Sequence, residues 1–125
     1  MRIVLVLSLL LAIAPAEASG PGPAPVIEVP VQETCREHIL EEPKMTVDDW
    51  PRRALGRPVS AYVVVTYDLD GSGSARNATV SDSHPNTTFD RTTLSLLERT
   101  SFAQGVVAQG CINVRTYGAV RRAEG

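Results

Sequence analysis

The chain has 125 residues, a net charge of −2 and few aromatic residues, 5% in all. Its basic residues are scattered singly or in pairs rather than in a stripe, so nucleic acid is not an expected partner. A chain of this size folds as one small domain, whose modest core would benefit from a covalent cross-link.

The N-terminus has the layout of a secretory signal peptide. A positive start precedes the apolar run of residues 3–13, and Ala16 and Ala18 supply small residues for cleavage. A retained membrane anchor is the alternative, but a spanning helix needs about 20 apolar residues. We therefore predict a signal peptide at residues 1–18, cleaved after Ala18, and no retained membrane span.

A Gly/Pro linker at residues 19–25 is predicted to lead into a single domain at 26–125, with its core at 46–121. Residues 26–31 alternate apolar and polar side chains, and Pro30 restricts such a strand to a sheet edge.

The chain has two cysteines, Cys35 and Cys111. An exported chain meets an oxidising compartment, and an even count favours pairing. The bridge would close a loop of about 77 residues and stabilise the fold by roughly 4 kcal/mol. A metal pair or a reactive thiol is the alternative, but only His38 lies near either cysteine, and no further histidine or cysteine stands nearby to complete a metal site. We therefore predict a disulfide.

Residues 46–55 are expected to form a helix. Asp48 or Asp49 can cap its start, and Pro51 suits its first turn. Gly56 can end it.

Two strands are predicted next, at residues 60–69 and 75–83. In the first strand, the face expected in the core holds Val63, Val65, Tyr67 and Leu69. The other face is expected to be half-exposed and holds Tyr62, Val64, Thr66 and Asp68. Ala75 is out of step with the apolar face of the second strand, which predicts a β-bulge near Arg76 or Asn77.

Residues 84–102 predict a second helix, in which Thr87 can cap the start and Asp90 follows three residues later. The residues that then recur at helical spacing, and are expected to face inward, are Phe89, Thr93, Leu96, Leu97 and Thr100. Residues 111–121 alternate again and predict a closing strand. The order helix, strand, strand, helix, strand favours an α+β fold with an antiparallel sheet.

The stretch between the two central strands, residues 68–73 (DLDGSG), raises the question of a calcium site. Its aspartates and serine match the first half of a calcium-binding loop, but Thr79 stands where such a loop has a bidentate glutamate. Asp70-Gly71 is also a strong hairpin signal. We therefore predict a turn and no metal site.

No set of residues predicts an enzyme or a cofactor. His38 and His84 lack partners at useful spacing, and the adjacent residues 81–84 cannot converge as a catalytic triad. Glu41-Glu42 is typical of a solvated surface.

Residues 50–102 resemble the C-terminal domain of TonB, the periplasmic energy transducer. The resemblance is carried by WPRRAL at 50–55, by the valine-rich strand and D-x-D-G turn within 62–80, and by FD at 89–90 leading a helix. Ala61 and the lack of a tryptophan near Phe102 depart from the family pattern.

The resemblance implies two helices packed on one face of a three-stranded antiparallel sheet. It also implies a periplasmic location and a role related to TonB-dependent transport, in which the domain pairs with an extended segment of an outer-membrane receptor or another envelope protein. The linker spans only about 20 Å even as polyproline, so we do not expect this chain to transmit proton-motive force by itself.

The edge of the closing strand is the expected binding site, because unpaired backbone groups there can accept an added strand. The predicted edge consists of Ile112, Asn113, Val114, Arg115, Thr116 and Tyr117, with Asn113, Arg115 and Tyr117 expected to sort partner side chains. Two alternatives are an edge that is simply kept soluble by its arginines and a structural protein of the cell envelope that forms a homodimer through this edge.

Overall fold

The computed structural model describes residues 24–122, so the predicted signal peptide and residues 19–23 of the linker lie outside the described residues. Within this part, the elements follow in the order β1 (Ile27–Glu28), β2 (Ile39–Glu41), β3 (Ser60–Asp70), β4 (Ala75–His84), α1 (Asp90–Glu98), β5 (Ser101–Phe102), β6 (Val107–Gly118) and β7 (Val120–Arg121). Short 3₁₀ turns lie at Arg36–His38, Val47–Asp49 and Arg52–Ala54.

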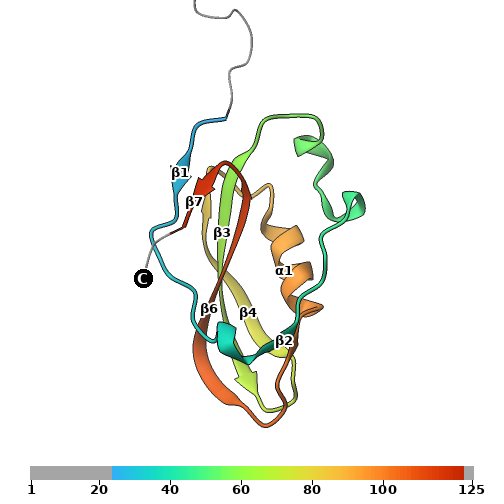
Figure 1. Cartoon of the computed structure of the whole chain (residues 1–125), viewed down its shortest axis with the longest axis vertical. Coiled ribbons are helices and arrows are strands. Elements are labelled where there is room, and N and C mark those ends of the chain that lie inside the picture. Colours follow the sequence, from blue (N-terminus) through green and yellow to red (C-terminus); the bar gives the residue numbers. More distant parts are fainter. Residues whose placement is uncertain (1–23, 123–125) are drawn as a thin grey trace, which may run out of the picture.

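A twisted antiparallel sheet in the order β4-β3-β6 forms the centre of the molecule (Figure 1). β3 and β4 are joined by a tight turn, in which Asp70 Oδ1 accepts the N–H of Ser72 at 3.0 Å. The predicted hairpin is therefore confirmed. The register slips between the Thr66 and Asp68 pairs, where Asn77 has a φ of 54°, so the predicted bulge is also confirmed.

The predicted fold class, two helices on a three-stranded sheet, is wrong. The described residues hold one α-helix, α1, and two further two-stranded pairs, β1-β7 and β2-β5. Residues 46–55 form two 3₁₀ turns instead of a helix. Trp50, directly before Pro51, is extended with a ψ of 129°, because a proline disfavours helical backbone in the preceding residue, and this divides the segment.

The second predicted helix is shorter than expected. α1 begins at Asp90, and its N-cap residue is Phe89, which makes no side-chain capping bond, so the expected Thr87 cap is wrong. The helical spacing itself is correct, since the predicted inward positions Phe89, Thr93, Leu96, Leu97 and Thr100 are all buried.

Apolar side chains cover both faces of the sheet. On one face, α1 and β5 pack against the predicted core face of β3. On the other, Tyr62 and Val64 of β3 are buried with Val29 and Val114, although they were expected to be half-exposed. Ile27, Val29 and Val31 provide this second cover, and Figure 1 shows β1 on the side of the sheet away from α1.

Candidate functional site

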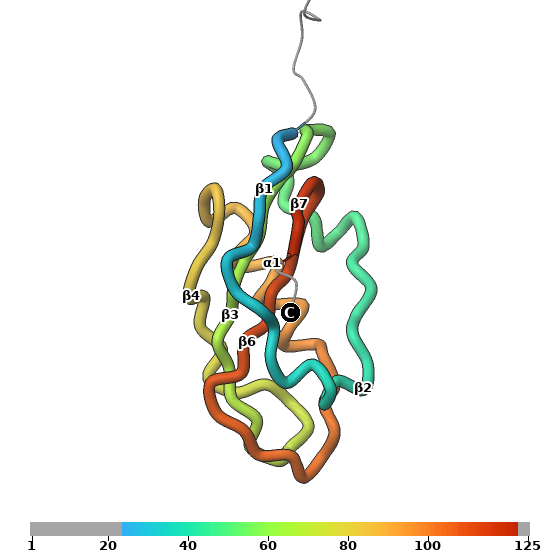
Figure 2. The backbone as a smooth tube through the Cα atoms, turned by 60° about the vertical axis from the view of Figure 1, so that its left-hand side comes forward, coloured from blue at the N-terminus to red at the C-terminus, as the bar shows by residue number. Residues whose placement is uncertain are grey.

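The outer edge of β6, where an added strand was expected to bind, lies beside the N-terminal segment, defined here as residues 26–35. Figure 2 shows this segment running beside β7 and then along β6. At its start, β1 pairs in parallel with β7, and Val29 N–H donates to Arg121 O at 2.9 Å. At its end, Cys35 packs against the apolar cluster on the face that carries α1.

Two residues of the N-terminal segment occupy backbone groups of β6. Thr34 N–H donates to Ile112 O at 2.9 Å, and Ile112 N–H donates to Thr34 Oγ1 at 2.8 Å. Val114 N–H donates to Glu33 Oε1 at 3.0 Å. The expectation of unpaired backbone groups along this edge is therefore wrong at Ile112 and Val114, and an incoming strand can pair there only after this segment has moved.

Glu33 is the most connected residue of this contact. Its Oε2 forms ion pairs with Arg36 Nη1 and Arg122 Nη1, both at 3.2 Å, and its side chain is only 12% exposed. One carboxylate thus links the N-terminal segment to β6 and to the chain after β7. Hydrogen bonds to a charged acceptor are stronger than neutral ones, so Glu33 is the main polar anchor of the segment.

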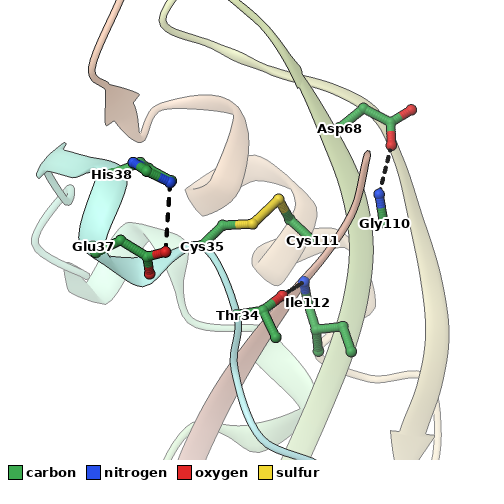
Figure 3. Close-up of a disulfide and its surroundings, with 8 residues drawn as sticks. All are labelled: Thr34, Cys35, Glu37, His38, Asp68, Gly110, Cys111 and Ile112. Carbon is green, nitrogen blue, oxygen red and sulfur yellow. Dashed lines mark hydrogen bonds and ion pairs between the residues drawn. A yellow bond between two sulfur atoms is a disulfide. The ribbon is translucent and has the colours of Figure 1, made fainter. Parts of the chain in front are cut away.

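The predicted disulfide between Cys35 and Cys111 is confirmed (Figure 3), with a Cα–Cα distance of 5.7 Å. It attaches the end of the N-terminal segment to β6 one residue before Ile112. Because residues 26–34 precede this bond, they can swing away from the edge while Cys35 stays attached.

The other predicted edge residues have different surroundings. Tyr117 is 1% exposed; its ring stacks on Phe89 with centroids 4.1 Å apart, and its hydroxyl shares a hydrogen bond of 2.8 Å with Thr93 Oγ1. Burial raises the pKa of Tyr117. Asn113 is also buried, so the expectation that Asn113 and Tyr117 sort partner side chains is wrong. Arg115 and Thr116 are half-buried.

Asp68 and Asp70, the aspartates that raised the question of a calcium site, are bound by other groups of the protein. Asp68 Oδ1 accepts Gly110 N–H at 3.0 Å, and its Oδ2 accepts Asn77 Nδ2 at 3.1 Å. These bonds, first that from Gly110, lower the pKa of Asp68. Asp70 pairs with Arg76 at 3.2 Å. Residues 24–122 contain no group of three or more acidic, histidine or cysteine side chains placed to hold a metal ion.

Glu33 and Thr34 are the site residues that the sequence reasoning missed. The N-terminal segment has no long periodic pattern, and a charged residue between Gln32 and Thr34 is ordinary in a loop. The alternation of residues 26–31 around Pro30 was the one signal present, and it did predict an edge strand.

No protein-family model matches the chain, and no curated protein matches its sequence. The similarity to the TonB C-terminal domain therefore stays a prediction for function, while the fold that it implied is corrected above. Within the described part of the chain, no helix is long and apolar enough to span a membrane.

Proposed function

We propose that this protein is an exported binding module of the cell envelope, located in the periplasm, whose β6–β7 edge pairs with an extended segment of a partner protein. The partner class suggested by the sequence is an outer-membrane receptor or another envelope protein involved in transport. The partner strand replaces residues 26–34 of the module's own N-terminal segment, which covers the edge in the unbound state.

The pairing of this edge with the N-terminal segment supports the proposal. β7 and β6 already accept an extended chain through backbone bonds at Val29 and Thr34 and through the side chain of Glu33. Main-chain hydrogen bonds supply affinity in strand addition, and pockets for alternate side chains supply specificity. Here Val29 packs against Tyr62, Val64 and Val114, and an apolar side chain of the partner strand would take the place of Val29 on this surface.

The opposite edge of the sheet is a poorer site for strand addition. β4 is largely exposed and polar, but its register shifts twice, and Asn77 has a positive φ. Bulges and charges of this kind protect an edge strand against pairing with another chain. The β6–β7 edge is therefore the proposed site.

A labelled peptide of residues 24–34 (APVIEVPVQET) tests the proposal as a probe strand. The double variant Val29→Ser/Glu33→Ala loosens the N-terminal segment, and Val107→Ser/Glu41→Ala changes the same residue types at exposed positions. We expect the peptide to bind the loosened variant at least about tenfold more tightly than the wild type or the control, because the competing segment no longer occupies the edge.

NMR amide shifts locate the bound peptide, and they are expected at Ile112, Val114 and Thr116. A folded loosened variant that shows no shifts at millimolar peptide would reject strand addition at this edge. Sedimentation velocity of the purified protein addresses the alternative of self-assembly: a dimer that dissociates on addition of the peptide would assign the edge to a second copy of the chain.

A further inference from the structure

Four arginines gather on the face that carries α1 and have no ion-pair partner among residues 24–122. Five other arginines of this part lie within ion-pair distance of a carboxylate, namely Arg36, Arg76, Arg99, Arg121 and Arg122. Of the five without such a partner, Arg115 is half-buried on β6, and the other four, Arg52, Arg53, Arg57 and Arg91, are all exposed. Since surface charges without partners are stabilised by water or by ligands, their grouping points to an anionic ligand.

Three of these arginines surround one cavity. Arg52, Arg53 and Arg91 line a hollow of about 600 Å³, with Trp50 in its wall. This volume falls within the range of small-molecule sites. The guanidinium group is planar and its parallel N–H groups match the oxygens of a phosphate, which favours a phosphate group as ligand.

Two carboxylates, Asp48 and Asp49, also line this cavity, and they differ in how strongly they would repel an anion. Asp49 is bound by Arg99 Nη2 at 2.6 Å and by Thr46 N–H at 2.9 Å, so its charge is largely neutralised. The Thr46 N–H is the main cause of its lowered pKa. Asp48 is exposed and opposes an anion, but three arginines outnumber it, and the cavity keeps a positive balance.

An apolar hollow adjoins the cationic cavity. It measures about 290 Å³ and is lined by Met45, Thr46, Val47, Trp50 and Leu55. Trp50 belongs to both hollows. Val47 is 77% exposed and Leu55 47% exposed, so apolar surface lies in solvent next to the arginines. Apolar side chains and a tryptophan beside basic residues are the combination that binds a membrane surface.

We propose that this face binds anionic phospholipid, with the headgroup phosphate in the arginine-lined cavity and Val47 and Leu55 in contact with the acyl region. Figure 1 shows the short turns at Val47–Asp49 and Arg52–Ala54 beyond α1, on the side of the sheet away from β1. The two sites are therefore separate, and a module held on a membrane keeps its β6–β7 edge accessible. The proposal does not depend on strand addition.

Fluorescence of Trp50, the one tryptophan of the chain, provides a direct readout. Vesicles of phosphatidylglycerol and phosphatidylcholine are titrated into the purified protein, with vesicles of phosphatidylcholine alone in parallel. We expect a blue shift and co-sedimentation with the anionic vesicles only, weakened by 0.5 M NaCl at roughly three times physiological ionic strength.

Variants of equal net charge distinguish a specific effect of the cavity arginines from a general effect of net charge. The variant Arg52→Gln/Arg53→Gln/Arg91→Gln is expected to bind roughly 100-fold more weakly, since each basic residue near the surface strengthens binding about fivefold. The control Arg76→Gln/Arg121→Gln/Arg122→Gln has the same net charge and is expected to stay within about threefold of the wild type. Equal losses in both variants would overturn the proposal.

Two further experiments test whether the bound phosphate belongs to a lipid or to a soluble molecule. The variant Val47→Ser/Leu55→Ser is expected to lose binding to anionic vesicles by roughly tenfold, because the buried apolar area is lost. Binding of soluble glycerol phosphate without any binding to vesicles would overturn the assignment to lipid. Binding of polyglutamate, again without vesicle binding, would assign the face to an acidic protein segment instead and would equally overturn it.

Discussion

Thr34 and Ile112 exchange two hydrogen bonds across the outer edge of β6, at 2.9 and 2.8 Å, although 78 positions separate them in the chain. Through this exchange the N-terminal segment occupies both the N–H and the C=O group of an edge residue. Because the acceptor for Ile112 N–H is the Thr34 hydroxyl, this half of the exchange can be removed without changing the backbone.

We expect Thr34→Val to lower the free energy of unfolding by about 1 kcal/mol, since one hydrogen bond is lost at nearly constant side-chain shape. The amide of Ile112 should exchange with solvent faster, as measured by hydrogen-exchange NMR. Thr79→Val is the control, because the Thr79 hydroxyl makes only a long bond of 3.4 Å to Asn77 O. Unchanged protection of Ile112 in the Thr34 variant contradicts the prediction.

The Cys35–Cys111 bond should contribute more to stability than any single hydrogen bond of the segment. Its sequence separation is 76 residues, for which the loop-closure model gives about 4 kcal/mol. We expect Cys35→Ser/Cys111→Ser to lower the urea midpoint accordingly. A reductant should destabilise the wild type to a similar extent and leave the double variant unchanged. A difference below about 1 kcal/mol between the free energies of unfolding of the wild type and the double variant would contradict this prediction.

The sequence predicts the central sheet well because its signals are local. Alternation marks β3, Asp70-Gly71 marks the turn, and the misplaced Ala75 marks the bulge at Asn77. A two-residue period and a turn dipeptide depend on neighbours in the chain, and no distant contact is needed to interpret them.

The helix expected at 46–55 is interrupted at Trp50 and Pro51, where the backbone is extended. Its capping residues and Pro51 are those of a helix start, but Val47 and Leu55 remain in solvent. Pro51 disfavours helical backbone at Trp50, so the capping signals produce two short turns and no continuous helix.

The cover of the β6 edge could not be predicted, because it is a tertiary contact of a short, proline-containing segment. The half-exposed face expected for Tyr62 and Val64 is buried only because that segment lies on it. Nothing in the sequence indicates the role of Glu33, because most of its partners are distant in the chain. It bonds to Arg36, Asn113, Val114 and Arg122.

Gly118 lies where β6 ends and the chain turns into β7, and it should be sensitive to substitution. Its φ is 75°, and a Cβ there would overlap the carbonyl group of Val59. We expect Gly118→Ala to lower the free energy of unfolding by about 3 kcal/mol, because left-handed backbone and steric overlap add together.

Gly56 offers a matched control for this prediction, which thermal unfolding can check. Its φ is 71°, but a Cβ there meets no atom within 4 Å. Gly56→Ala should therefore cost only about 1 kcal/mol, the conformational part alone. Equal melting temperatures for the two variants would show that Val59 is not in contact with Gly118.

Asp68 should make stability depend on pH at the end of the sheet where β3 meets β6. Gly110 N–H and Asn77 Nδ2 bind its carboxylate and lower its pKa below the ordinary value of 3.8. The ionised form therefore favours the folded state, with its full contribution above pH 3.8 and a loss as the pH falls through the lowered pKa. We expect Asp68→Asn to be less stable than the wild type at pH 6, and this gap to shrink as the pH drops below 3.8. Urea unfolding of both proteins across this pH range checks the prediction. If the difference in their free energies of unfolding stays constant as the pH falls, the charge of Asp68 does not stabilise the fold.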